Sequence, residues 1–345
     1  MYRNLFVCIF IISTAFSGQY KKSAIVIDYT DKKKVLFEEK ADDIRYPASL
    51  TKMMTVYILL ETIKKNKIKY NTKFKTSKLA ASQSPSKLNL KPGDTITVKD
   101  IIKALLVKSA NDVAVVAAEG VAGSVDNFCK LMNQKCKKLG LKKTHFVNSS
   151  GLPNSKQVTC ARDMAKLGMA LYRDFPQHWH LFSSKSFTHN KITHQTHCKI
   201  LKWYNGADGA KTGYIAASGF NLMVTAAMKN NQGKQKRMFV VVMGGDSSKS
   251  RDMYAAELMD KYFKGYKPFK QDNNKLLQTN KNAKNSLRQQ ISKSEMLDTI
   301  VHYDDEIFIN TNDKIPTIDK KFIDDLYLID DELIQEDSEI FISAK

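Results

Sequence analysis

Apolar side chains recur at intervals of three and four positions in five stretches of this chain, and that period is typical of amphipathic helices. In the first stretch Met53, Val56, Leu60 and Ile63 follow this spacing. Gly140 comes directly after the third stretch, where a glycine commonly ends a helix. The predicted helices cover residues 49–63, 98–122, 125–139, 163–172 and 251–263.

Apolar runs of strand length lie before and after these helices. They form two pairs, and a short polar turn separates the members of each pair, which predicts hairpins. The predicted strands cover residues 23–29, 34–38, 220–228 and 238–244. Because strands at both ends of the sequence enclose a run of helices, we expect an α+β fold and not a doubly wound one.

Ser49 and Lys52 place a hydroxyl group and an amine three residues apart at the start of the first predicted helix. Residues i and i+3 share a helix face, so the lysine amine can reach the serine hydroxyl. A serine needs a neighbouring base to act as a nucleophile, and a partly desolvated lysine can lose its proton and serve as that base. Pro47 suits a helix start, where free backbone N–H groups point outward. The pattern indicates an activated serine enzyme.

Ser84 and Lys87 repeat the same spacing, so the spacing alone has little specificity. They lie within residues 70–100, which are rich in loop-forming residues and contain a clear turn at 91–94. No apolar helical period follows Lys87, and we therefore expect a surface loop. Evidence from other segments of the chain is therefore needed to favour Ser49 over Ser84 as the nucleophile.

One such segment is Ser109-Ala110-Asn111, which interrupts the apolar helical run at 98–122. Polar side chains at that position suit a cleft between helices. The Asn111 amide can donate to a substrate carbonyl and accept from a substrate N–H, and the Ser109 hydroxyl can relay a proton.

A second segment is Lys211-Thr212-Gly213, which precedes the predicted strand at 220–228. A lysine and a threonine that project from a strand edge can bind a carboxylate. Glycine at the third position would let a substrate backbone approach closely. Neither this tripeptide nor the preceding one is specific alone.

In the order Ser-x-x-Lys, Ser-x-Asn and Lys-Thr-Gly, with about 57 and about 100 residues between them, the three segments resemble the penicillin-recognising serine peptidases and β-lactamases. Longer blocks resemble the low-molecular-mass D-alanyl-D-alanine carboxypeptidases, peptidase family S11. This resemblance extends over roughly residues 20–265. The blocks that carry it are YPASLTKMMT at 46–55, SAND at 109–112, LMN at 131–133, NSSGL at 148–152, ARDMA at 161–165 and DGAKTGY at 208–214.

The resemblance implies an antiparallel sheet built from N- and C-terminal strands, with flanking helices and a helical subdomain. It implies that Ser49 attacks the carbonyl between the two terminal D-alanines of a peptidoglycan pentapeptide, with Lys52 as the general base. Ser109 and Asn111 would then assist proton relay and orient the peptide. β-Lactam antibiotics would acylate the same serine, and no metal or other cofactor is needed.

The resemblance also implies a carboxylate site at Lys211 and Thr212, and an oxyanion hole made by the backbone N–H groups of Ser49 and Tyr214, beside Gly213. Arg251 has two interpretations. It fixes the substrate or the lysine-bearing strand, or it is an exposed arginine at a helix start.

Three alternative functions use the same segments. A serine β-lactamase of class A would add a glutamate that activates the deacylating water, and the sequence shows no convincing counterpart. An endopeptidase would cut peptidoglycan crosslinks with the same residues. A catalytically silent wall-binding protein is disfavoured because all three segments are intact.

The family pattern is not followed at residues 189–198, which include three histidines and one cysteine. His189, His194, His197 and Cys198 could mimic a zinc site, but their spacing is irregular. Elsewhere, Cys129 and Cys136 would lie about 10.5 Å apart along one helix, which is too far for a disulfide. We expect most cysteines to be small buried hydrophobes.

The chain has 345 residues, 43% of them hydrophobic, so the predicted catalytic domain at 18–266 can bury a sizeable core. Residues 1–17 predict a secretory signal peptide, with a basic start, an apolar run and small residues before the expected cut. The apolar run is shorter than the roughly 20 residues of a membrane span. A retained anchor is the alternative. We expect an exported protein, in the periplasm or at the outer face of the cytoplasmic membrane.

Charge is divided unevenly along the chain. Residues 295–345 hold 15 acidic and 4 basic side chains, while the remainder carries a net charge of +31. No nucleic-acid-binding signature accompanies the lysines, so we expect attraction to anionic envelope polymers or peripheral membrane association, and no nucleic acid. A lysine-rich composition with no electrostatic role is an equal alternative. Residues 267–294 are polar and predict a linker. We expect the acidic tail at 295–345 to be partly disordered or docked on the basic body.

Overall fold

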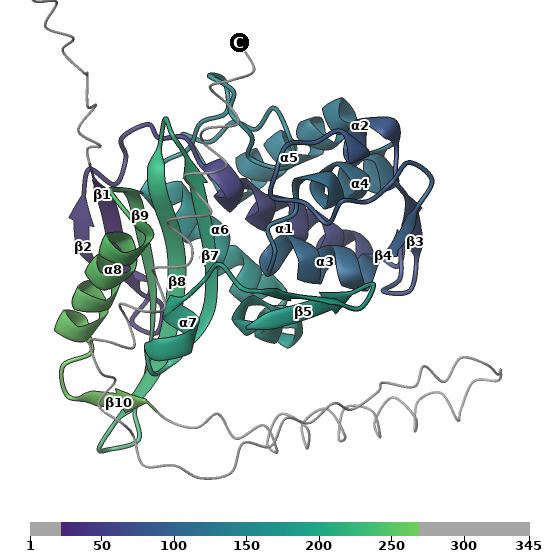
Figure 1. Cartoon of the computed structure of the whole chain (residues 1–345). Coiled ribbons are helices and arrows are strands. Elements are labelled where there is room, and N and C mark those ends of the chain that lie inside the picture. Colours follow the sequence, from purple (N-terminus) through teal and green to yellow (C-terminus); the bar gives the residue numbers. More distant parts are fainter. Residues whose placement is uncertain (1–21, 269–345) are drawn as a thin grey trace, which may run out of the picture.

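The computed structural model describes residues 22–268 of the chain (Figure 1). The predicted signal peptide at 1–17 and acidic tail at 295–345 lie outside the described residues, as does all but the first two residues of the linker at 267–294. These assignments, and the location of the protein in the cell, stay predictions. Within the described part, none of the helices is both long and apolar enough to cross a lipid bilayer.

A sheet of six strands forms one side of the molecule. Its main path runs β10-β8-β9-β1-β2, and β7 pairs with β8 on the same side as β10. Every pairing is antiparallel. The predicted α+β fold, with an antiparallel sheet built from both ends of the chain, is confirmed. The strands are β1 (Ser23–Asp28), β2 (Lys34–Glu39), β7 (Ala207–Ile215), β8 (Gly219–Asn230), β9 (Gln235–Gly245) and β10 (Tyr266–Pro268).

Both faces of the sheet are covered, which explains why its central strands are apolar at successive positions. Ile25 and Ile27 of β1 belong to the cluster that contains α1 (Thr51–Lys64) and α6 (Ala161–Asp174). Ala24 and Val26 point to the other side and belong to the cluster with the outer helices. Those outer helices, which cover the face of the sheet opposite to α1 and α6 (Figure 1), are α7 (Ile200–Trp203) and α8 (Ser248–Tyr262).

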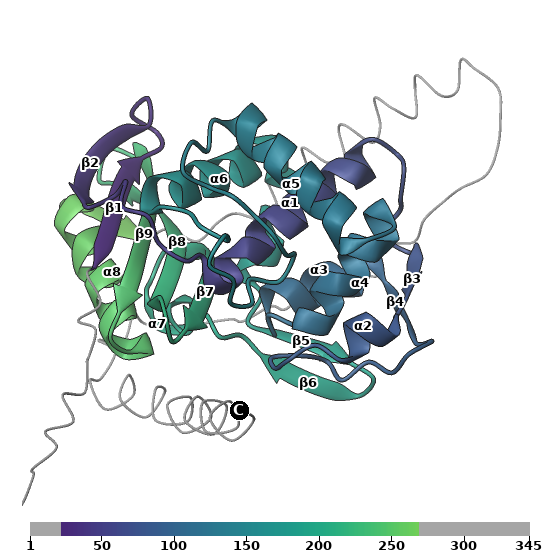
Figure 2. The same cartoon turned by 90° about the horizontal axis from the view of Figure 1, so that it is seen from above.

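The helical subdomain lies beside the sheet, on the side of α1 (Figure 2). It contains the small sheets β3–β4 and β5–β6 in addition to its helices. Its elements are β3 (Lys73–Lys75), α2 (Lys78–Ala81), β4 (Thr95–Thr97), α3 (Val98–Leu106), α4 (Asn111–Ala122), α5 (Val125–Leu139), η2 (Pro176–Ser183), β5 (Ser186–His189) and β6 (Ile192–Gln195).

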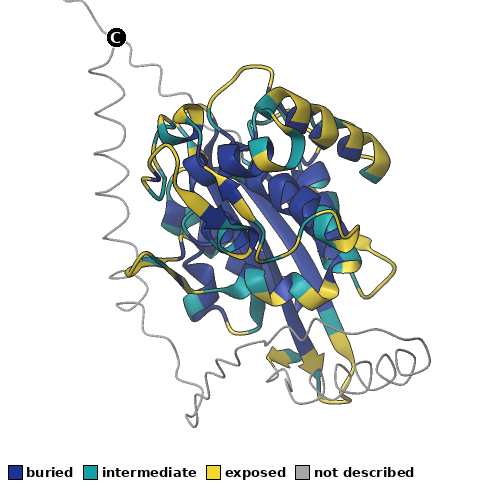
Figure 3. Ribbon diagram, turned by 90° about the vertical axis from the view of Figure 1, so that its right-hand side faces the viewer, coloured by how far each residue is buried: buried dark blue, intermediate teal, exposed yellow. Residues whose placement is uncertain are grey.

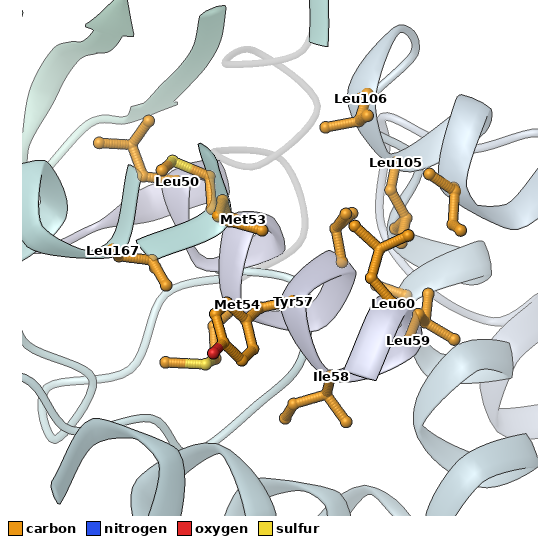
Figure 4. Close-up of a cluster of buried hydrophobic side chains, with 14 of the residues drawn as sticks. Leu50, Met53, Met54, Tyr57, Ile58, Leu59, Leu60, Leu105, Leu106 and Leu167 are labelled. Atoms are coloured by element: carbon orange, nitrogen blue, oxygen red, sulfur yellow. The ribbon is translucent and has the colours of Figure 1, made fainter. Parts of the chain in front are cut away.

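Helix α1 joins the two parts and is surrounded by both. Every residue from Thr51 to Leu60 is buried. Figure 3 shows that buried residues gather in the interior of the molecule and exposed ones at its periphery. Met53 and Met54 lie toward Leu167 of α6, whereas Leu59 and Leu60 lie toward Leu105 of α3 (Figure 4). Each such side chain contributes about 1.5–3 kcal/mol on burial. The helix therefore holds its first turn on a rigid support.

Two predictions about local structure need correction. The run at 98–122 is two helices, because α3 ends at Leu106 and α4 begins at Asn111. The loop-rich region at 70–100 and the histidine-containing segment contain short strands that the sequence did not predict. Strands of three or four residues carry too few positions to show a period of two.

A buried ion pair fastens β7 to the sheet interior. Arg237 of β9 donates from Nη1 to Asp208 Oδ1 at 2.8 Å, and its guanidinium lies 4.3 Å from the ring centroid of Tyr172. Asp208 Oδ1 also accepts from Thr225 Oγ1 of β8 at 2.8 Å. The Arg237 side chain is only 3% exposed. Removing one partner of such a pair leaves the other charge poorly solvated.

We therefore expect Arg237→Leu to lower the free energy of unfolding by about 3–5 kcal/mol. Chemical denaturation followed by circular dichroism measures this loss. Arg173→Leu is the control, since Arg173 pairs with Asp174 but its side chain is 50% exposed, and the loss there should stay below about 1 kcal/mol. Equal losses in the two variants would contradict the expectation.

Candidate active site

Ser49 lies in a single 3₁₀ turn, η1 (Ala48–Leu50), that leads directly into α1. Both neighbours of Ser49 in this turn are buried, whereas Ser49 itself is partly exposed. Ala48 has a φ of +46°, a left-handed conformation that is uncommon outside glycine and tends to occur at functional sites. The turn presents one hydroxyl to solvent from an otherwise buried segment.

Two glycines from distant parts of the chain enclose this turn. A Cβ atom on Gly151 would lie 1.9 Å from the Ala48 carbonyl oxygen, and one on Gly213 would lie 2.9 Å from the Ser49 nitrogen. Any side chain at either position would therefore displace the turn. The sequence suggested that Gly213 admits a substrate backbone, but the backbone that it admits here is that of the Ser49 turn.

Lys52 is fully buried, and its amine makes three hydrogen bonds. Its Nζ donates to Ser49 Oγ at 2.9 Å, to Asn111 Oδ1 at 2.7 Å and to the Ser150 carbonyl at 2.6 Å. Two of these three acceptors carry no hydrogen of their own, and only the Ser49 hydroxyl can also donate. If the ammonium loses one proton, its lone pair therefore has one available partner, Ser49.

The environment of Lys52 favours that loss. Burial, followed by the positive charge of Lys211, holds the pKa of Lys52 well below its ordinary value, while the Asp112 carboxylate acts in the opposite direction. A neutral amine in hydrogen-bonding contact with a serine hydroxyl is the arrangement that a general base requires.

Ser109 and Asn111 lie at the break between α3 and α4. Ser109 has a φ of +60°, and Asn111 is the first residue of α4. Ser109 Oγ accepts from Lys211 Nζ at 3.0 Å, so the serine links the helical subdomain to β7. The helix break thus brings one polar side chain, Asn111, to Lys52 and another, Ser109, to Lys211.

The Asn111 side chain is occupied entirely by the protein. Its Nδ2 donates to the carbonyls of Ser84 and Pro85, both at 2.9 Å, and its Oδ1 accepts from Lys52. The sequence suggested that this amide donates to a substrate carbonyl. Both of its hydrogens are already directed to protein carbonyls, so in this conformation Asn111 serves Lys52 and not a ligand.

Lys211 lies in β7, the strand that packs on the Ser49 turn, and is fully buried. Its Nζ donates to Ser109 Oγ and, at 2.8 Å, to the Thr212 carbonyl. The pKa of Lys211 is lowered to about 8, mainly by burial; Cys198 opposes this shift, and the nearby charge of Arg251 adds to it. At neutral pH this lysine stays mostly cationic. Thr212 is 7% exposed, whereas Tyr214 is 37% exposed at the same end of β7.

Arg251 lies in the first turn of α8 and is 3% exposed. Its Nε donates to Asp252 Oδ1 at 2.7 Å and its Nη1 to the Asn221 carbonyl of β8 at 3.4 Å. The interpretation as an exposed arginine at a helix start is therefore wrong. The positive charge of Arg251 lowers the pKa of Lys211, and its hydrogen bond to Asn221 stabilises β8, the strand next to β7.

Sequence reasoning missed three contributors to this arrangement. The Ser150 carbonyl binds Lys52, and the carbonyls of Ser84 and Pro85 bind Asn111. These are backbone groups, which no side-chain pattern reveals. Ser150 nevertheless lies inside the block at 148–152 that carried the family resemblance. The predicted loop at Ser84–Lys87 is confirmed as a loop, yet its backbone contacts the site.

The histidine-rich segment does not form a ligand set. His189 and His194 lie on the β5–β6 hairpin, and both rings stack near the Phe187 ring. Cys198 is 1% exposed in the cluster between the sheet and its outer helices. Among residues 22–268, no three His, Cys, Asp or Glu side chains are grouped to hold a metal ion. The predicted burial of the cysteines is confirmed for Cys129, Cys136, Cys160 and Cys198, all of them free.

Comparison with known proteins agrees with this geometry. The model of the D-alanyl-D-alanine carboxypeptidase family, peptidase family S11, matches residues 15–247. The chain is 38% identical over 258 residues to the D-alanyl-D-alanine carboxypeptidase DacC of Escherichia coli, and 34% identical over 249 residues to DacF of Bacillus subtilis. These alignments cover 72% and 71% of the chain, but only 63% and 62% of the two relatives.

Solved structures show the same likeness. Penicillin binding protein 5 from Haemophilus influenzae has a TM-score of 0.65 at 32% identity, covering 71% of each chain. Penicillin-Binding Protein D2 from Listeria monocytogenes, solved in an ampicillin-bound form, has a TM-score of 0.60 at 27% identity. That match covers 75% of this chain and 98% of the other. The chain therefore belongs to the D-alanyl-D-alanine carboxypeptidase family.

Proposed function

We propose that this protein is a serine-type D-Ala-D-Ala carboxypeptidase, which removes the terminal D-alanine from peptidoglycan pentapeptides through an acyl-enzyme on Ser49. The observation that carries the proposal is the buried Lys52 amine, whose one hydrogen-bond partner able to give up a proton is Ser49. Membership of the family supports the same reading.

In the proposed acylation, Lys52 Nζ takes the hydroxyl proton while Ser49 Oγ attacks the carbonyl carbon of the scissile amide. The electron pair moves to the carbonyl oxygen, where the backbone N–H groups of Ser49 and Tyr214 would stabilise the negative charge. When the carbonyl reforms, the C–N bond breaks and the amine of D-alanine leaves. That amine takes its proton from Lys52, with Ser109 as a relay. An ester on Ser49 remains.

The terminal carboxylate of the peptide would bind at Lys211 and Thr212. Lys211 suits this role because its pKa of about 8 keeps it mostly charged at pH 7, and because the buried Arg251 adds positive potential behind it. Lys52 and Lys211 thus divide two tasks: Lys52, whose pKa is held well below its ordinary value, acts as the base, and Lys211 binds the carboxylate as a cation. Water then attacks the ester carbonyl and gives a proton to Lys52. The bond between Ser49 Oγ and the carbonyl carbon breaks, Ser49 Oγ takes that proton from Lys52, and the shortened peptide leaves with a new carboxylate. A β-lactam would acylate Ser49 in the same way.

The test combines two measurements on purified protein. Labelled penicillin should attach covalently in a 1:1 ratio, and a peptide ending in D-Ala-D-Ala should release free D-alanine. Prior exposure to penicillin should stop that release. Absence of both reactions would overturn the proposal.

Two further assays on the same protein separate the alternatives. A β-lactamase would hydrolyse a chromogenic β-lactam at high turnover without releasing D-alanine from the peptide. An endopeptidase would convert crosslinked muropeptides to monomers. A relative named D-alanyl-D-alanine endopeptidase, from Haemophilus influenzae, is 28% identical over 261 residues, so muropeptide analysis belongs in the experiment.

A further inference from the structure

Asp112, the residue after Asn111, is completely buried and binds backbone N–H groups of a distant loop. Its carboxylate accepts from Leu88 N at 3.1 and 3.0 Å and from Leu90 N at 3.2 Å. It also accepts from Val113 N of its own helix at 2.8 Å. Hydrogen bonds to an ionised acceptor are the stronger kind. Asp112 therefore anchors the loop at 84–90 to the start of α4.

The other end of this loop is attached to the site itself. Asn111 N donates to the Ser86 carbonyl at 2.6 Å, and Ser86 Oγ donates to the Lys108 carbonyl at 2.8 Å. The carbonyls of Ser84 and Pro85 take both hydrogens of the Asn111 amide. Hydrogen bonds between residues 84–86 and both Lys108 and Asn111 thus hold the loop against the break between α3 and α4.

This contact decides which way the Asn111 amide faces. Two carbonyl oxygens can pair with its NH₂ group but not with its oxygen, so Asn111 Oδ1 must point away from the loop. In that direction it meets Lys52 Nζ at 2.7 Å. If the loop were displaced, the Asn111 amide could rotate, and Lys52 would lose a fixed hydrogen-bond acceptor. That acceptor orients the Lys52 amine so that its third hydrogen-bonding direction points at Ser49 Oγ.

We propose that Asp112 is a positioning residue, which holds the loop at 84–90 against Asn111 and thereby directs the Lys52 amine toward Ser49. This inference rests on the proposed function, because it needs Lys52 to act as the base. In this proposal the surface loop around Ser84 contributes to catalysis through its backbone carbonyls, which orient the Asn111 amide.

Asp112 also affects the protonation of Lys52. The charged groups that face Lys52 are Lys211 from β7, which favours the neutral amine, and Asp112 from α4, which favours the ammonium. Removing the Asp112 charge should therefore lower the pKa of Lys52 further. Lys52 would then act as a base at lower pH. If the substitution only loosened the site, water would enter and hydrate the ammonium, and the pKa of Lys52 would rise instead.

The experiment measures the rate constant for acylation by labelled penicillin between pH 4 and pH 9, in the wild type and in Asp112→Asn. We expect the variant to be acylated roughly tenfold to a hundredfold more slowly, as misplacement of a reacting group produces. We also expect the acidic limb of its pH profile to move to lower pH. An unchanged rate, or a limb that stays in place or moves to higher pH, would overturn the inference.

Asp163→Asn is the matched control. Asp163 is also buried in the first turn of a helix and accepts from a preceding loop, namely from Lys143 N at 2.7 Å and Thr144 Oγ1 at 2.9 Å. It should lose thermal stability to a similar degree while keeping the wild-type acylation rate and pH profile. An equal loss of acylation in both variants would reduce Asp112 to a structural role. Lack of labelling in the wild type would instead reject the proposed function itself.

If Asp112→Asn does not fold, Ser86→Ala decides the question. It removes only the bond from Ser86 Oγ to the Lys108 carbonyl and should slow acylation a few-fold without moving the acidic limb, since no charge is lost. Ser82→Ala is its control, because Ser82 Oγ makes a similar bond to the Leu79 carbonyl away from the site. Equal rates in these two variants would overturn the inference.

Discussion

We expect Ser49→Ala to abolish covalent labelling by penicillin and to lower D-alanine release by a factor on the order of 10⁶, as removal of the serine nucleophile does in other hydrolases. We expect Ser84→Ala to keep both reactions at the wild-type level. The two serines share the Ser-x-x-Lys spacing. They differ because Lys52 Nζ is buried and bonded to Ser49 Oγ, whereas Lys87 Nζ bonds the Ala81 carbonyl.

The comparison is stringent because Ser84 also contacts the site. It does so through its carbonyl, which binds Asn111 and is retained when the side chain is replaced. Labelled penicillin, gel fluorescence and intact-mass analysis check both variants. Labelling that persists in Ser49→Ala, or that disappears in Ser84→Ala, would contradict the assignment of the nucleophile.

Lys52→Met should lower the acylation rate constant by about 10²–10⁴, the contribution of a positioned general base. Methionine fills a similar buried volume without an amine, so the core around α1 should stay packed. Stopped-flow acylation and thermal unfolding together measure this outcome. A loss of acylation that merely parallels unfolding would contradict a chemical role.

The pH profile makes this prediction sharper. Acylation should rise as the pH increases through the low pKa of Lys52, because only the neutral amine accepts the serine proton. For a peptide with a free carboxylate it should fall again near pH 8, as Lys211 loses its charge. Lys52→Met should lose the acidic limb and keep the alkaline one. A wild-type profile with no acidic limb would reject Lys52 as the base.

The longer elements of the fold could be predicted from the sequence because their patterns extend over many residues. The helices at 125–139 and 251–263, for example, agree with α5 and, within a few residues at its start, with α8. The break between α3 and α4 was missed as a helix boundary because apolar residues continue across it. Its cause is a left-handed Ser109, and a backbone conformation of this kind has no marker in composition.

The candidate site was predictable as far as side chains define it. Ser49, Lys52, Ser109, Asn111 and Lys211 were all named from the sequence. The structure joins Lys52 to Ser49 and Asn111, and joins Lys211 to Ser109, as two hydrogen-bonded groups. The direction of the Asn111 amide was not predictable, because it depends on two carbonyls some 26 residues earlier in the chain. Roles carried by backbone groups become visible only when the tertiary contacts are known.

The two glycines that pack on the Ser49 turn link the reactivity of Ser49 to the folding of the chain. Gly151 and Gly213 both pack closely on this turn, and Gly213 belongs to β7, far along the chain from Ser49. We therefore expect a chain in which β7 has not yet docked, or one that has misfolded, to react poorly with penicillin. Covalent titration with a β-lactam should thus count correctly folded molecules one by one, and its time course after dilution from denaturant should report the moment at which β7 docks.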